Sequence, residues 1–176
     1  QLRLENVFRT GGASLLWRAA KVGMRLSIGV PPFFAPVNGM VDTDPLREYL
    51  CQALGSANGK LPGVDRNLAA GRLRGVALAT TLYATSETVN FFSGCQIDEW
   101  VRPYRRSVET KLTVEHIMAS SALPFLFPPI QIDDHWYGDG GVRLIAPLAP
   151  AIHMGADRMI VISTHFIGSP GSPPTT

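Results

Sequence analysis

Two short runs of uninterrupted apolar residues constrain the fold of this chain more than any other feature. Residues 76–83 (VALATTLY) and 158–163 (RMIVIS) are too continuous for strands with one face in water, and they suit strands covered on both sides. Between them, residues 112–123 (LTVEHIMASSAL) have helical spacing, a capping residue at Thr113 and a stop before Pro124. Strand, helix and strand in this order predict an α/β layered domain.

Capping and turn residues predict the remaining elements. Residues 88–93 are expected to pair back on 76–83 across a short turn at Ser86 and Glu87. Asp44 is expected to be the N-cap of a helix that Gly55 stops, with Pro45 at its first position. The other expected elements are helices at 14–26 and 146–157, loops at 27–41 and 55–71, and a hairpin, 130–132 with 135–139, around the solvated turn Asp133–Asp134.

Composition limits the class of protein. With 176 residues, 45% of them hydrophobic, the chain suits one globular domain, expected over residues 1–168 and followed by a disordered tail or linker at 169–176. The net charge of +2 gives no argument for nucleic acid. One dense cationic patch, Arg102, Arg105 and Arg106, has two interpretations: a solvated loop, or a contact with anionic lipid or phosphate.

Two cysteines, Cys51 and Cys95, are too few for a disulfide framework and match no zinc spacing. They fit a reduced compartment, so the expected location is the cytoplasm or the periphery of a membrane. No apolar run reaches the length of about 18 residues that a membrane-spanning helix needs.

The stretch with the clearest chemical content is YGDGGVR, residues 137–143, between a short strand and a helix. Asp139 is followed by Gly140 and Gly141, which permit positive φ and a close approach of backbone to a neighbouring loop or ligand. A carboxylate at such a strand end can face the crevice where α/β sheets bind ligands. Alone, the motif is also a common hairpin turn, and both interpretations stay open on these three residues.

Several motifs in order resemble the C-terminal half of the patatin-like phospholipase domain. They are a helix ending in ASSALP (119–124), an FPP segment (127–129), the DGG loop (139–141), a proline-containing helix start (147–150) and a GAD turn (155–157). Upstream, DTDPLREYL (42–50) and RLRGVALATTLYATSETVNFF (72–92) are also similar to that family. The resemblance covers about residues 42–165.

This resemblance implies a three-layer α/β/α domain, incomplete at its N-terminus, that hydrolyses acyl esters of lipids such as phospholipids or lysophospholipids. In the family, a Ser–Asp dyad performs the reaction, and Asp139 is the position that matches its aspartate, the general base. Gly140 and Gly141 would hold the carboxylate, and Arg143 would orient it or meet a polar head group. Neither a metal nor an organic cofactor is implied, and peripheral contact with a membrane is expected.

The chain departs from the family pattern at the nucleophile. It contains no G-x-S-x-G; the nearest approach, residues 12–16 around Ser14, lacks the second glycine, and Ser14 is expected to cap a helix. We expect the serine and the Gly-rich oxyanion loop upstream of Gln1, which would leave this chain inactive alone. The alternative is a non-catalytic lipid-binding or interaction module on the same scaffold.

Other nucleophilic and basic side chains are expected to be structural. Ser120 and Ser121 lack elbow glycines and are expected to close a helix. The histidines show no metal spacing and are expected to pack or to face solvent: His116, His135, His153 and His165. Phe33 and Phe34, with Trp17, are expected in the core, and a lip for an acyl chain is the alternative.

Overall fold

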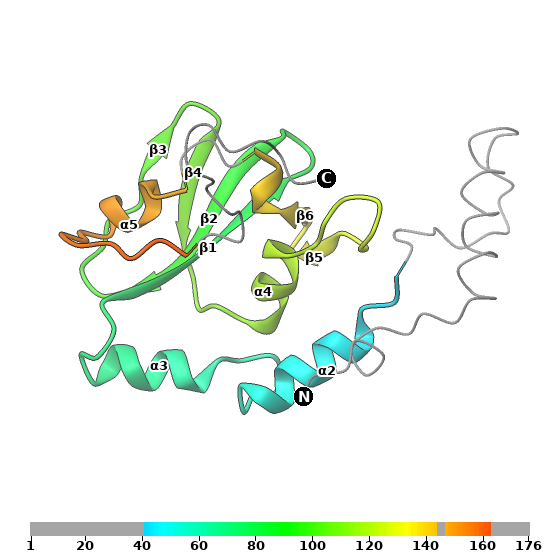
Figure 1. Ribbon diagram of the computed structural model, residues 1–176, viewed down its shortest axis with the longest axis horizontal. Helices are drawn as coiled ribbons and strands as arrows, with labels where there is room; N and C mark the ends of the chain where they lie inside the picture. The colour runs from blue at the N-terminus through cyan, green and yellow to red at the C-terminus, as the bar shows by residue number, and fades with distance from the viewer. Residues whose placement is uncertain (1–40, 144–146, 163–176) are drawn as a thin grey trace, which may run out of the picture.

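The computed structural model describes residues 41–143 and 147–162. In this part of the chain, six strands form one mixed sheet with helices on both faces (Figure 1). In chain order, the elements are α2 (Asp44–Ala53), α3 (Pro62–Ala69), β1 (Gly75–Leu82), β2 (Glu87–Gly94), β3 (Val101–Arg102), β4 (Arg105–Glu109), α4 (Val114–Ser120), β5 (Ile130–Ile132), β6 (His135–Asp139), the 3-10 helix η2 (Gly140–Arg143) and α5 (Ala149–His153). The predicted α/β class is confirmed.

The sheet has the strand order β3-β4-β2-β1-β6-β5. β1 and β2 form the predicted hairpin, with Ser86 in the left-handed region at φ 56° in its turn. β4 joins β2 in parallel, and β6 joins the other edge of β1 in antiparallel, over Thr80–Leu82 alone. Among the described strands, none pairs with the β6-side edge of β1 from Gly75 to Ala79.

Alternation along β1 and β2 separates two apolar clusters. On one face, Leu82, Val89 and Phe91 are buried against α4 and the start of α3. The same cluster contains Val114 and Met118 of α4 and Leu61, the N-cap of α3. On the other face, Phe92 and Trp100 stack with ring centroids 5.5 Å apart, and Met154, just after α5, packs on them. Helices therefore cover both faces, as a three-layer α/β/α domain requires.

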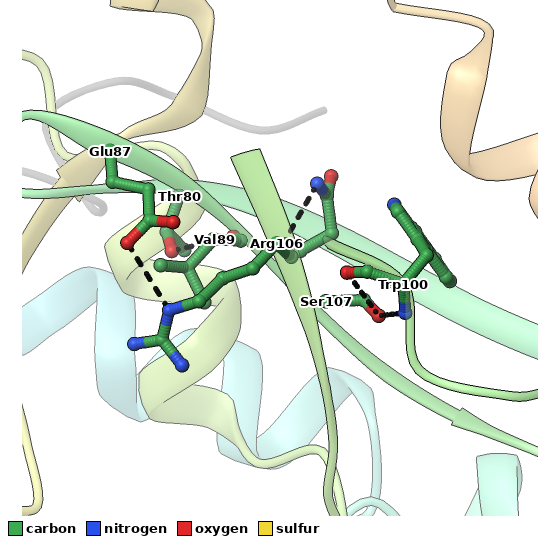
Figure 2. Close-up of polar contacts among 7 residues, drawn as sticks. Thr80, Glu87, Val89, Trp100, Arg106 and Ser107 are labelled. Atoms are coloured by element: carbon green, nitrogen blue, oxygen red, sulfur yellow. Dashed lines mark hydrogen bonds and ion pairs between the residues drawn. The ribbon is translucent and has the colours of Figure 1, made fainter. Parts of the chain in front are cut away.

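Polar side chains tie the strands together within these layers (Figure 2). The buried hydroxyl of Thr80 donates to the carbonyl of Val89 at 2.9 Å. The backbone N–H of Trp100 donates to Ser107 Oγ at 2.7 Å, which holds the segment before β3 against β4. Each bond satisfies a polar group that the sheet has removed from water.

Helix α4 begins and ends as the sequence predicts. Thr113 is its N-cap, and the side chains of Thr113 and His116 form a reciprocal capping box. A histidine thus takes the place that glutamate or glutamine usually fills at the third helical position. Helix α2 also forms, but its N-cap is Thr43 and not Asp44; the Asp44 N–H donates to the Asp42 carboxylate at 3.0 Å, which lets the helix begin one residue earlier.

Two predictions about local structure are wrong. Residues 55–71 are not only a polar connection, because α3 forms there with Pro62 in its first turn. Residues 158–162 form no strand, and Ile160 and Ile162 are 94% and 92% exposed. Apolarity alone does not make a strand: its N–H and C=O groups need a neighbouring strand, and no described strand lies beside this segment.

Several expectations fall outside the described residues. These are the helix at 14–26 with Ser14, most of the loop at 27–41 with Phe33 and Phe34, Trp17, His165 and the domain end at 168. Cys51 and Cys95 are both free thiols. In the described part of the chain, no helix is long and apolar enough to cross a membrane.

Candidate active site

Asp139 is the last residue of β6, and its backbone is fixed from two sides. Its N–H donates to the carbonyl of Ala122, just beyond α4, at 2.9 Å. Its own carbonyl accepts a bond from the Thr81 hydroxyl of β1 at 2.8 Å. The position of the residue is therefore set by packed elements on both sides.

The half-buried carboxylate of Asp139 is oriented by its own loop. Oδ1 accepts the backbone N–H of Gly141 at 2.7 Å. Among residues 41–143 and 147–162, no donor bonds to Oδ2. One oxygen therefore fixes the direction of the group, and the other has lone pairs left for a hydroxyl proton, as a general base needs.

Close backbone approach explains the first glycine of the loop. A Cβ at Gly140 would lie 2.8 Å from the Cβ of Ala79 and nearer still to the Ala79 carbonyl. At Gly141, the nearest atom to such a Cβ is Asp139 Oδ1, at 3.1 Å. Of the two reasons expected for these glycines, close approach is confirmed for Gly140, whereas neither residue adopts positive φ.

Tyr83 is a neighbour of the site that the sequence did not reveal. Its phenol ring lies over Gly138, where a Cβ would come within 2.7 Å of Tyr83 Cε1. Burial raises the pKa of the Tyr83 phenol, and the negative charge of Asp139 raises this pKa further. The available signal was alternation: Thr81 pairs with Gly138, so Tyr83, two residues on, points to the same face as that glycine.

The side chain of Arg143 reaches the β1–β2 turn. Its Nη1 donates to the carbonyl of Ser86 in the β1–β2 turn at 2.7 Å, and its Cζ is 6.0 Å from the centroid of the Tyr104 ring. The guanidinium is exposed, so a role toward a polar head group stays a prediction. Within the described chain, no hydrogen bond or ion pair joins Arg143 to Asp139, the contact that an orienting role would need.

The alternative nucleophiles and bases have structural roles. Ser121 Oγ donates to the carbonyl of Ile117 at 3.1 Å and so closes α4, as predicted. His153 stacks on Trp100 with ring centroids 4.8 Å apart, and His135 is exposed at the start of β6. Among the described residues, no group of three His, Cys, Asp or Glu side chains is placed to hold a metal ion.

His116 is buried and engaged in the cap of α4. Its Nδ1 accepts the N–H of Thr113 at 3.1 Å, and its ring meets Phe91 edge-on at 4.6 Å. Burial lowers the pKa of His116, and the negative charge of Asp133 partly opposes this shift. A neutral ring that accepts at Nδ1 carries its proton on Nε2.

A cavity of about 520 Å³ lies between β1 and α5. Its walls are mainly apolar and include Ala77 and Ala79 of β1 and Ala151 and Met154 from the α5 region. Its volume falls within the usual range for small-molecule sites, about 300–1,000 Å³. Because Gly140 packs against Ala79, one wall of the cavity continues into the Asp139 loop.

Comparison with known proteins gives one match. A family model described as "Patatin-like phospholipase" matches residues 33–152, more than half of the chain and including the Asp139 loop. No curated protein and no solved structure matches the chain.

Proposed function

The chain belongs to the patatin-like phospholipase family, which places it among hydrolases of lipid substrates, and from this premise we propose that it hydrolyses lipid acyl esters with a Ser–Asp dyad. Asp139 is the aspartate of this dyad. The serine belongs to a G-x-S-x-G elbow that this sequence does not contain.

One observation carries the assignment: the carboxylate of Asp139 is fixed in direction but only half engaged. Gly141 holds Oδ1 at 2.7 Å, and Ala122 and Thr81 hold the backbone. A base positioned in this way loses little freedom when it meets a hydroxyl, because the surrounding structure has already ordered it. In the described part of the chain, the exposed hairpin residue Asp134 has no comparable support.

The chemistry follows from this position. Oδ2 of Asp139 takes the proton of the serine hydroxyl as the serine oxygen attacks the ester carbonyl. Asp139 then gives this proton to the departing alcohol, leaving an acyl-serine. Water attacks the acyl-serine while Asp139 takes one of its protons, and the fatty acid leaves as serine regains a proton. The net reaction is ester plus water giving acid plus alcohol.

The surroundings of the loop support a lipid substrate. Leu123 and Phe125, which follow Ala122, are 45% and 89% exposed, and Val142 beside the glycines is 54% exposed. Apolar side chains grouped at a polar site suit a molecule with an acyl chain and a carbonyl group. Phospholipids and lysophospholipids have both, and their hydrolysis would bring the protein to a membrane surface.

The proposal divides the active site between this chain and preceding polypeptide. No described strand pairs with the β6-side edge of β1 from Gly75 to Ala79, and this edge, adjacent to Gly140, supports a place for the strand that would present the serine. The oxyanion-binding N–H groups would come from the same polypeptide. The 176-residue chain alone is therefore proposed to be inactive.

The test compares two matched variants in the protein that joins this chain to its elbow serine. Asp139→Asn should lower the turnover of a fluorogenic acyl ester by about 10²- to 10⁴-fold, the usual contribution of a positioned base. Asp134→Asn makes the same change at an exposed turn and should retain full turnover. Thermal unfolding should show both variants folded.

Near-normal turnover by Asp139→Asn would remove Asp139 from the mechanism. A second outcome separates the alternative function: if no upstream G-x-S-x-G exists and no ester is hydrolysed, the chain is a lipid-binding or interaction module on this scaffold.

A further inference from the structure

A small cationic surface projects from the sheet beside the candidate active site. We name it the cationic edge, and it consists of Val101, Arg102, Tyr104 and Arg143. Val101 and Tyr104 are 70% and 74% exposed, although both are large hydrophobic side chains. Tyr104 lies between the end of β3 and the start of β4, two strands labelled in Figure 1. It has φ 58°, a conformation that costs energy for a bulky residue.

The two arginines of the cationic edge carry no neutralising partner in the described chain. Arg102 Nη1 donates to the carbonyl of Val101 at 2.9 Å, and Arg143 Nη1 donates to the carbonyl of Ser86 at 2.7 Å. Each guanidinium has five N–H donors and both side chains are exposed, so most of their hydrogen-bonding capacity faces solvent. Arg106 differs, because its Nε pairs with Glu87 at 3.3 Å (Figure 2).

A backbone hydrogen bond and a cation–ring contact connect the cationic edge to the Asp139 loop. The N–H of Thr88 donates to the carbonyl of Tyr104 at 3.0 Å, which holds the β3–β4 turn beside β2. Arg143, whose Cζ is 6.0 Å from the Tyr104 ring centroid, ends the 3-10 helix that begins at Gly140. A surface that receives Arg102, Tyr104 and Arg143 would therefore also lie near Asp139.

Acidic side chains lie at both edges of the sheet, since the exposed Asp98 and Glu99 precede β3, where Glu99 Oε1 accepts the N–H of Glu109 at 2.7 Å. The exposed Asp133 and Asp134 occupy the β5–β6 turn, and the strand order places β5 at the opposite edge from β3. Five strand spacings of roughly 4.8 Å each separate these edges, more than the Debye length of about 8 Å at physiological salt. The positive charge of Arg102 is thus not cancelled by this acidic turn.

We infer that the cationic edge docks the protein on an anionic phospholipid bilayer, and this inference deepens the proposed function, on which it rests. Arg102 and Arg143 bind lipid phosphates with their free N–H groups. Tyr104 lies at the head-group level, where a ring with a polar tip is favoured, and Val101 adds apolar contact. Docking in this orientation brings the Asp139 loop to the surface that holds the ester substrates.

The test is co-sedimentation of the 176-residue chain with vesicles, which needs no hydrolysis. Binding should be stronger to phosphatidylcholine vesicles that contain phosphatidylglycerol than to phosphatidylcholine alone. Arg102→Gln should lower the partition coefficient on the anionic vesicles by about fivefold, the contribution of one cation near such a surface. Its control is Arg66→Gln in α3, which removes the same charge and a similar bond, from Arg66 Nε to the carbonyl of Pro62.

A second variant tests the aromatic contribution. Tyr104→Asn should fold, since asparagine tolerates positive φ, and it should weaken binding to both kinds of vesicle. Equal binding by the Arg102→Gln and Arg66→Gln chains would overturn the inference. Displacement from vesicles by inorganic phosphate at constant ionic strength would also overturn it, because a site for free phosphate would then explain the cationic edge.

The two proposals fail separately in these experiments. Weaker vesicle binding by Arg102→Gln, with no ester turnover in the protein that joins this chain to its elbow serine, would retain the docking surface and reject the dyad. Turnover that depends on Asp139, with vesicle binding unaffected by Arg102→Gln, would retain the dyad and reject the docking surface.

Discussion

Gly140→Ala should destabilise the fold more than any other single methyl group added to the Asp139 loop. The new Cβ would lie 2.8 Å from Ala79 Cβ and closer to the backbone carbonyl of Ala79, in the middle of β1. Non-bonded heavy atoms rest at about 3.5–4.0 Å, so the loop or the strand must move by roughly 1 Å. Overpacking against a backbone that cannot rotate away costs about 2–3 kcal/mol of unfolding free energy.

For a chain of this length, that loss corresponds to a fall in Tm of roughly 4–12 °C. The assay is thermal unfolding followed by circular dichroism, with two control variants. Gly141→Ala meets only the carboxylate of Asp139 at 3.1 Å, a side chain that can give way, so its effect should stay below about 1 kcal/mol. Gly63→Ala, in α3 with no atom within 4 Å of the new Cβ, should raise stability by about 0.5–1 kcal/mol.

The order of the three variants is the critical result. If Gly140→Ala unfolds within about 0.5 kcal/mol of the original chain, which is the range of ordinary surface substitutions, then Gly140 does not pack against β1 and the account of the loop fails. A Gly141→Ala variant less stable than Gly140→Ala would refute it equally, because the position that cannot accept a Cβ would then be Gly141 and not Gly140.

Three further predictions concern stability and ionisation. Because burial lowers the pKa of His116, the unfolded chain binds more protons than the folded one in mild acid. The contribution of His116 to the free energy of unfolding should therefore be fully present above the pKa of an unfolded histidine, about 6.5, and should decrease as the pH falls through that value. His116→Gln, which can keep the capping box, should flatten that part of the curve in urea titrations, and an unchanged slope would exclude His116 as the cause. Phe92→Ala, at a fully buried residue stacked on Trp100, should cost about 3–5 kcal/mol, whereas Phe125→Ala at an 89% exposed residue should cost almost nothing; equal urea midpoints would contradict the assigned core. Asp139→Asn should lower the pKa of the Tyr83 phenol, since it removes the negative charge that opposes formation of the phenolate. The check is ultraviolet titration with Asp134→Asn as the control; equal Tyr83 pKa values in the two variants would show that Asp139 does not act on this phenol.

Local sequence signals predicted the elements that depend on neighbours in the chain. The β1–β2 hairpin follows from an apolar run, a turn at Ser86 and a second run, and its register needs no distant partner. Helix α4 follows from Thr113 and from apolar spacing that ends before Pro124. The β5–β6 hairpin that leads to Asp139 was predicted for the same reason.

Elements that depend on distant partners were not predicted. β4 pairs in parallel with β2, and the sequence Arg105–Glu109 has the charge of a solvated loop, so only its neighbour reveals it as a strand. The segment at 158–162 shows the opposite error, because it was predicted as a strand and is not one. An apolar run cannot form strand hydrogen bonds without a neighbouring strand. Helix α3 was missed because a polar, glycine-containing stretch has low helix propensity, which packing of Leu61 and Val64 overrides.

The candidate site shows the same division. The motif and its resemblance identified Asp139 and its glycines, but the reason for Gly140 became visible only with β1 beside it. Tyr83 lies 56 positions from Asp139 in the sequence, and only the pairing of β1 with β6 brings its ring over Gly138.

Labelling with a fluorophosphonate, which reacts covalently with an activated serine, tests the central claim most directly. In the protein that joins this chain to its elbow, mass spectrometry should find the label on the serine of G-x-S-x-G, and Asp139→Asn should slow labelling by at least about 10²-fold while Asp134→Asn leaves it unchanged. Equal labelling rates for the two variants, or a label on Ser120 or Ser121 of this chain, would contradict the assignment of Asp139 as the base that activates the serine.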